Sequence, residues 1–181
     1  MTRFGYVMVT YFAAMGAAVA AFIPTPTRLV WNATASAPVG LYTIAPADRL
    51  EVPELVAVMP PEPLADFLVG RGYVGRGVPL LKRVLGLPGQ QVCRIGRDIM
   101  INGTAVGSAL SRDKMGRDLP VWQGCRTVAD DELFLMNWEV PDSLDGRYFG
   151  PLAASTVIGR AIPLYTDEDG HGRFVWRAPT R

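Results

Sequence analysis

Residues that commonly carry catalysis are scarce in this chain of 181 residues. It has one histidine, His171, and two cysteines, and only Lys82 and Lys114 among its 18 basic residues are lysines. A single histidine in the hydrophilic loop Asp167–Gly172 argues against both Ser-His-Asp and Cys-His catalysis. The lone histidine and the absence of a CxxC motif also argue against a zinc site, so we expect no metal and no cofactor.

Positive charge is neither abundant nor clustered. The net charge is +1, and no block of basic residues interrupts the sequence. A protein that binds nucleic acid normally presents a basic patch or stripe to the phosphates. The charge pattern therefore argues against nucleic acid as a partner.

The two cysteines, Cys93 and Cys125, are candidates for a disulfide bond. In the chain-entropy model such a bridge would contribute roughly 3–4 kcal/mol, and it would require an oxidising compartment. Two separate buried thiols are the alternative, and the sequence leaves both open.

Charge is missing altogether from Phe4–Ile23. Twenty helical residues with a rise of about 1.5 Å each match a hydrocarbon core roughly 30 Å thick. The segment is either a retained membrane anchor or a cleaved signal peptide, with Ala18–Ala20 as its small-residue cleavage site. We favour the anchor because the apolar run is longer than a usual signal core. Either interpretation predicts that the chain from Arg28 onward is exported.

Prolines and glycines, 15 and 19 in number, divide the rest of the chain into short segments. Segments rich in apolar and β-branched residues predict strands over 41–44, 55–58, 80–84, 91–94, 98–101, 132–135 and 156–163. Asn102-Gly103 predicts a hairpin turn, and Pro63–Gly70 predicts one short helix. We therefore expect an anchor over residues 1–27 and a mostly β domain over residues 28–181.

Lys82 lies within an apolar run, Val78–Leu85. On a strand, Leu80 and Val84 share the face of Lys82, while Arg83 points to the other side. Lysine can lose its proton in such surroundings, whereas arginine cannot. Lys82 is therefore a candidate general base, with a snorkelling lysine on an edge strand as the alternative.

Ser36 is the serine best placed to be activated by a lysine. It lies among small residues in Trp31–Tyr42, where a substrate strand could approach its hydroxyl. Pro38 and Gly40 predict a turn before the next strand. With no histidine to compete, a Ser-Lys pair is the chemistry that the sequence favours. Structural roles suit three other serines, Ser108, Ser111 and Ser155.

Three segments resemble, in order and spacing, the motifs of the type I signal peptidase superfamily. They are Thr34–Tyr42, Pro79–Gly89 and Asp142–Pro151. Three further segments are similar to its conjugal-transfer branch, the TraF-type peptidases: Leu29–Asn32, the insert from Pro60 to Pro79, and Val121–Cys125. Ala37, Met136–Val140 and Gly146 depart from general signal peptidases, which favours a dedicated enzyme.

The resemblance implies a signal-peptidase-like β domain and a role for each site residue. Ser36 would be the nucleophile and Lys82 the general base. The hydroxyl of Thr34 and the amide of Ser36 would form the oxyanion hole. Three supporting residues would orient the lysine amine or buttress the site: Ser143, Asp145 and Arg147.

The resemblance further implies a serine endopeptidase that cleaves an exported protein precursor after small residues through an acyl-enzyme. We expect it in the bacterial inner membrane, held by its N-terminal helix, with its catalytic domain in the periplasm. The expected substrate is a conjugative pilin precursor, which would be hydrolysed or cyclised. The alternatives are a general leader peptidase and a non-catalytic scaffold of a conjugation or secretion apparatus. A self-cleaving regulator of the LexA type is disfavoured by the apolar anchor.

Overall fold

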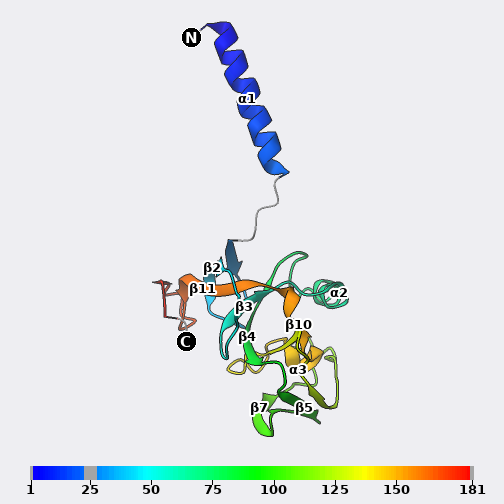
Figure 1. Cartoon of the computed structure of the whole chain (residues 1–181). Helices are drawn as coiled ribbons and strands as arrows, with labels where there is room; N and C mark the ends of the chain where they lie inside the picture. The colour runs from blue at the N-terminus through cyan, green and yellow to red at the C-terminus, as the bar shows by residue number, and fades with distance from the viewer. Residues whose placement is uncertain (1, 23–27, 180–181) are drawn as a thin grey trace.

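The computed structural model describes residues 2–22 and 28–179, so the last residue of the predicted apolar segment, Ile23, lies outside the described residues. Helix α1 covers Arg3–Ala21 and begins after Thr2, whose side chain accepts a hydrogen bond from the amide of Gly5. None of its residues is buried against the domain below it (Figure 1). By length and composition α1 could cross a membrane.

The larger sheet has eight strands in the order β1-β2-β11-β3-β4-β9-β10, with β12 paired to β11. Its neighbouring strands all pair antiparallel. The strands are β1 (Leu29–Asn32), β2 (Val39–Ala45), β3 (Leu55–Val58), β4 (Leu80–Gly86), β9 (Glu132–Leu135), β10 (Leu152–Ala153), β11 (Val157–Asp167) and β12 (Val175–Trp176).

A four-stranded antiparallel sheet in the order β7-β6-β5-β8 forms the end of the domain farthest from α1 (Figure 1). It consists of β5 (Gln91–Ile95), β6 (Asp98–Ile101), β7 (Thr104–Ser108) and β8 (Gly124–Thr127). The turn between β6 and β7 has φ of 49° at Asn102 and 80° at Gly103. Both values are those of the predicted Asn-Gly hairpin turn, which is confirmed.

Helices outside α1 are short: α2 (Glu62–Gly70), α3 (Gly146–Phe149) and the 3-10 turn η1 (Ala154–Thr156). Leu64 and Leu68 are the buried residues of α2 and form its inner face. Phe67 lies between Tyr73 and Phe149, with ring centroids 6.0 and 5.9 Å away. The prediction of a mostly β fold with an N-terminal apolar helix and a short inserted helix is confirmed.

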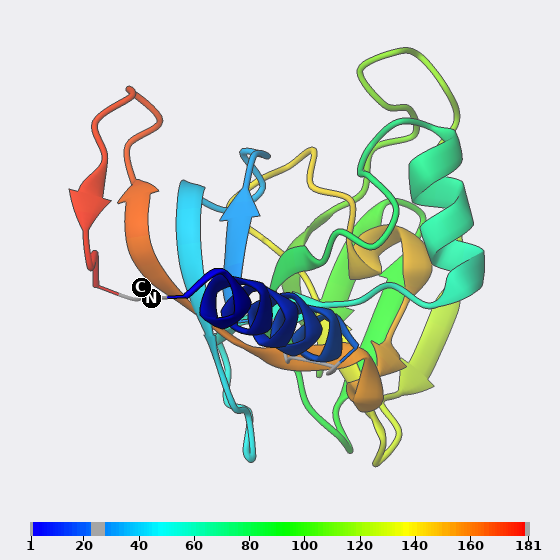
Figure 2. The same cartoon turned by 90° about the horizontal axis from the view of Figure 1, so that it is seen from above.

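The long strand β11 makes the larger sheet curl, because its two ends pair with different neighbours. Its second half pairs with β2 and its first half with β3, and the register shifts in both pairings. Figure 2 shows β11 curving along the sheet. A turn at Ala35 and Ser36 precedes β2, as predicted, but Gly40 lies inside β2, so its predicted place in the turn was wrong. A Cβ there would come 2.2 Å from the carbonyl oxygen of Tyr165, so the strands approach closely only with glycine.

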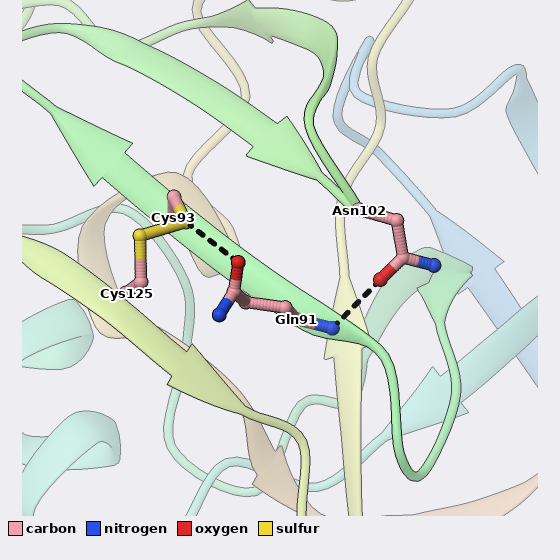
Figure 3. Close-up of a disulfide and its surroundings, with 4 residues drawn as sticks. All are labelled: Gln91, Cys93, Asn102 and Cys125. Carbon is pink, nitrogen blue, oxygen red and sulfur yellow. Dashed lines mark hydrogen bonds between the residues drawn. A yellow bond between two sulfur atoms is a disulfide. The ribbon is translucent and has the colours of Figure 1, made fainter.

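A disulfide joins Cys93 of β5 to Cys125 of β8, which face each other directly in the ladder. Figure 3 shows the bridge together with Gln91, whose side-chain oxygen lies 3.7 Å from the sulfur of Cys93. Gln91 also bonds to Asn102: its backbone amide donates to the side-chain oxygen of that turn residue at 2.9 Å. The bridge thus adds a covalent link to a small sheet that has its own hydrogen-bonded turn.

Replacing both cysteines, Cys93→Ala with Cys125→Ala, should lower the free energy of unfolding by roughly 3–4 kcal/mol, because the bridge closes a loop with a sequence separation of 32. Urea unfolding of the oxidised protein and of the double variant measures the difference. A reducing agent should lower the stability of the wild type and leave the double variant unchanged. Equal stability of the two oxidised proteins would contradict the expectation.

Candidate active site

The loop between β1 and β2 carries Thr34 and Ser36 and is organised by a buried asparagine. The side-chain nitrogen of Asn32 donates to the carbonyl oxygens of Thr34, Ala37 and Pro38 at 2.8, 3.0 and 3.1 Å. Its side-chain oxygen accepts from the amide and the hydroxyl of Thr34. The side chain of Asn32 therefore holds the loop through these hydrogen bonds. A buried polar group needs such partners, and the loop supplies them.

Ser36 is half-buried at this turn, and its hydroxyl lies next to the hydroxyl of Thr34. Its Oγ lies 3.2 Å from the Oγ1 of Thr34, which also lies 3.0 Å from the Oδ1 of Asn32. When the Thr34 hydroxyl donates to Asn32, its oxygen remains free to accept from Ser36. The two hydroxyls that the sequence singled out are therefore in contact.

Lys82 lies in the middle of β4 and is only 5% exposed. Its cross-strand partner is the fully buried Val56, and Val84 lies on the same face. The ammonium nitrogen donates to the Oγ of Ser143 at 2.9 Å. Burial lowers the pKa of Lys82 from 10.5 to about 8; nearby Asp145 raises this pKa and Arg147 lowers it.

A cavity of about 780 Å³ brings these groups together. Thr34, Ser36, Lys82 and Ser143 all line it, although β2 and β4 are separated in the sheet by β11 and β3. Ser36 also lines a smaller cavity of about 290 Å³. Among the described residues, Lys82 and Ser36 face the larger cavity without a direct hydrogen bond between them. A peptide carbonyl placed at Ser36 would therefore have free space next to it.

Asp145 and Arg147 form a buried ion pair behind Ser143. The guanidinium donates to both carboxylate oxygens, at 2.9 and 2.8 Å, and the two side chains are 0% and 1% exposed. The remaining N–H groups of Arg147 donate to the carbonyl oxygens of Asn137, Val140 and Pro141. These three hydrogen bonds hold the segment that leads to Ser143, and neither side chain of the pair lines the larger cavity.

Asn137 was missed as a functional residue by the sequence analysis. It follows β9, is 4% exposed, and donates from its side-chain nitrogen to the carbonyl oxygens of Ser36 and Leu81. Its side-chain oxygen accepts from the amide of Arg83 at 2.8 Å. A possible signal was its position directly after the fully apolar segment Leu133–Met136, where a buried polar residue needs specific partners.

The sole histidine and the second lysine of the chain are both exposed. His171 is exposed in its loop, where its amide donates to Asp167. Lys114 is exposed and pairs with Asp142 at 2.6 Å at the edge of the larger cavity. Within residues 2–22 and 28–179, no cluster of three or more His, Cys, Asp or Glu side chains could hold a metal ion.

The chain is similar to signal peptidases and to conjugal transfer proteins. The model of the signal peptidase family, peptidase S26, matches residues 1–165. The chain is 34% identical over 145 residues to the plasmid transfer protein TraF of Escherichia coli, covering 75% of this chain and 81% of that protein. It is 36% identical over 145 residues to the probable conjugal transfer protein TraF of Sinorhizobium fredii, covering 75% and 76%. The solved signal peptidase I of Enterococcus faecalis aligns with 22% identity and a TM-score of 0.37, over 62% of this chain and 97% of that one.

Lys82→Met should make the protein more stable near neutral pH, by about 1–3 kcal/mol. Below pH 8 the wild type keeps a buried ammonium, and a fall in pKa from 10.5 to about 8 corresponds to about 3 kcal/mol, less the lost bond to Ser143. Between pH 8 and 10.5 the folded protein loses this proton before the unfolded chain does. The advantage of methionine should therefore shrink across that window.

Urea unfolding of the full chain at pH 7 and at pH 10.5 measures this difference. Lys114→Met is the matched control, because that lysine is exposed and paired with Asp142. Asp142 raises the pKa of Lys114 through their hydrogen bond, so its removal should bring no gain at either pH. A Lys82→Met protein less stable than the wild type at pH 7 would contradict the assignment of a destabilising ammonium.

Proposed function

We propose that this chain, which belongs to the signal peptidase family, peptidase S26, uses Lys82 as the general base and Ser36 as the nucleophile of its serine protease activity. The resemblance first seen in three sequence segments is thereby confirmed at the level of the family, and the relatives are conjugal transfer proteins. One observation carries the proposal: a buried lysine with a lowered pKa and a serine hydroxyl line the same cavity.

In the proposed first step, neutral Lys82 accepts the proton of the Ser36 hydroxyl while Oγ attacks a substrate carbonyl carbon. With a pKa of about 8, roughly a tenth of the lysine is neutral at pH 7. Ser143 is already hydrogen-bonded to the amine, so it restricts the directions in which the lone pair points. We assign Ser143 this orienting role.

The oxyanion formed in this step needs donors, and we assign them to the amide of Ser36 and the hydroxyl of Thr34. The hydroxyl lies beside the Ser36 oxygen, and it would turn its proton from Asn32 to the developing charge. Collapse of the intermediate breaks the scissile C–N bond, and the proton on Lys82 passes to the leaving amine. The product is an ester between Ser36 and the substrate's acyl group.

Two nucleophiles can release this ester. Water gives hydrolysis, whereas an amine such as the substrate's own N-terminus gives a new peptide bond and a cyclic product. In each case Lys82 takes a proton from the nucleophile, and Ser36 regains one as the C–O bond breaks. We propose an exported pilin precursor as the substrate, because the relatives are named as conjugal transfer proteins.

We further propose that residues 1–27 anchor the enzyme in the bacterial inner membrane and that residues 28–181 form its periplasmic catalytic domain. Support comes from the apolar helix α1, which is long enough to span, and from the disulfide, which requires an oxidising compartment. An anchored enzyme would meet its precursors as they leave the membrane.

Ser36→Ala and Lys82→Arg should each abolish cleavage of pilin precursors, because the first removes the nucleophile and the second replaces the base with a permanent cation. Membranes that carry each full-length variant are incubated with candidate precursors, and the products are identified by mass. A product lighter than the hydrolysed one by one water is cyclic.

Ser155→Ala and Lys114→Arg are matched controls, since neither Ser155 nor Lys114 takes part in the proposed chemistry. Both should retain activity. Normal processing by Ser36→Ala and Lys82→Arg would refute the dyad. Processing of ordinary exported precursors with no preference for pilin would instead indicate a general leader peptidase, and no processing by the wild type would favour a scaffold.

The rate of cleavage should rise with pH, with its midpoint at about 8, because the neutral form of Lys82 is the active base. Below pH 7 the rate should fall about tenfold for each pH unit. Initial rates from pH 6 to pH 10 on one fluorogenic peptide test this, with unfolding followed at each pH. A rate that stays constant from pH 6.5 to pH 9 would contradict the role of Lys82.

A further inference from the structure

The side-chain amide of Asn137 makes hydrogen bonds to β4 beyond the point where β9 stops pairing with that strand. β9 pairs with β4 only through Val84 and Gly86, and the amide of Met136 makes the last backbone bond, to Arg83. From there the side chain of Asn137 continues the ladder, accepting from the amide of Arg83 and donating to the carbonyl of Leu81. These two bonds lie on either side of Lys82 along the strand.

The same amide reaches the nucleophile loop. Its nitrogen has a second hydrogen, which is donated to the carbonyl oxygen of Ser36 at 2.5 Å. One NH₂ group thus joins the backbone of Ser36 to that of Leu81, the residue before Lys82. Only a carboxamide combines two such donors with the acceptor that Arg83 uses, since a carboxylate accepts only and an apolar side chain does neither.

The sheet itself cannot set the separation between Ser36 and Lys82. Two strands, β11 and β3, lie between β2 and β4, and the register of β11 shifts in its pairing with each neighbour. A change in curl would therefore move the Ser36 loop relative to β4. Asn137 links the two segments directly and bypasses these strands.

Asn137 is itself fixed from behind by the buried ion pair. Its amide donates to a carboxylate oxygen of Asp145 at 3.0 Å, and its carbonyl oxygen accepts from Arg147 at 3.1 Å. Both backbone groups and all functional atoms of the side chain are therefore engaged. This is the arrangement expected of a buried polar network that specifies one geometry.

We propose that Asn137 is a positioning residue, which holds the Ser36 hydroxyl at the distance and angle that the Lys82 amine requires. The inference rests on the proposed Ser-Lys chemistry and adds a residue to it. The side chain of Asn137 bonds to backbone groups and not to the Ser36 hydroxyl or the Lys82 amine, so it acts through the backbone of Ser36 and of β4.

The test compares Asn137→Ala with Ile99→Ala in the full-length chain, using one fluorogenic peptide with alanine at the cleaved position. Ile99 is fully buried in β6, which lines neither cavity at Ser36, so its truncation destabilises the protein without removing a side chain from either cavity. A misplacement of about 1 Å costs about 100-fold in rate. We expect kcat of Asn137→Ala to fall about 100-fold with KM changed less than threefold, while Ile99→Ala keeps its kcat.

The pH profile separates positioning from a general loosening of the site. If only the alignment of the pair is lost, the plateau rate falls and the midpoint stays at about 8. If the site opens, water reaches Lys82 and the midpoint moves toward 10.5. The second outcome, a normal kcat in Asn137→Ala, or an equal loss in Ile99→Ala would overturn the proposal.

Asn137→Asp keeps the shape but removes both donors, and it replaces the alanine variant if the latter does not fold. The same loss of kcat is expected from it, and a normal kcat would overturn the proposal. Ser36→Ala is measured in parallel. Activity in Ser36→Ala would refute the proposed function itself, whereas an inactive Ser36→Ala beside a fully active Asn137→Ala would refute only the positioning role.

Discussion

The buried ion pair between Asp145 and Arg147 is the interaction on which the site depends. Two charges in the protein interior are tolerated only when their geometry is good and their remaining hydrogen-bonding groups are satisfied. Here the carboxylate is held by two parallel N–H bonds, and the guanidinium also donates to three backbone carbonyls. Those carbonyls belong to the segment from Asn137 to Pro141. The pair therefore shapes the loop that carries Ser143 to Lys82 and Asn137 to Ser36.

The two charges of the same pair act on Lys82 in opposite directions. Asp145 raises the pKa of the lysine and Arg147 lowers it, so the larger influence, burial, decides the direction. Burial comes from the apolar side chains of the larger sheet, Val56 and Val84 among them, which exclude water from the amine. The availability of a neutral amine thus depends first on packing, and the neighbouring cation Arg147 adds to it. The proposed chemistry of Lys82 therefore depends on the integrity of the sheet around it.

Much of the fold was predictable because apolar segments bounded by turns are a local signal. The strands over 55–58, 98–101 and 132–135 have the predicted bounds, and β11 extends beyond its predicted end to Asp167. Among the strands that were missed, β8, β10 and β12 carry little of this signal. β8 is exposed at every position, and β10 and β12 have two residues each. Strands of this kind form because a neighbouring strand offers hydrogen bonds, which the local sequence does not encode.

The residues of the candidate site also differ in whether the sequence alone could indicate them. Lys82 stood out from its own surroundings, since an apolar strand makes a basic residue conspicuous. Asn137 did not, because its side chain bonds to residues 101 and 56 positions away, and an asparagine after a strand usually belongs to a turn. Residues whose chemistry is unusual in their local context can be found from one sequence. Residues that connect distant segments need the three-dimensional structure.

The use of lysine at position 82 and arginine at position 147 follows from what each buried cation has as partners. Arg147 remains charged, since guanidinium does not lose its proton in proteins, and it has a carboxylate and three carbonyls to stabilise that charge. Lys82 has a neutral hydroxyl as its hydrogen-bond partner, and the amine can still accept from that hydroxyl after losing a proton. Exchanging the two residue types would put a permanent charge at position 82, where the proposed mechanism needs a proton to leave, and a removable charge at position 147, where it would pair with the Asp145 carboxylate. The environment of each residue selects one residue type and excludes the other.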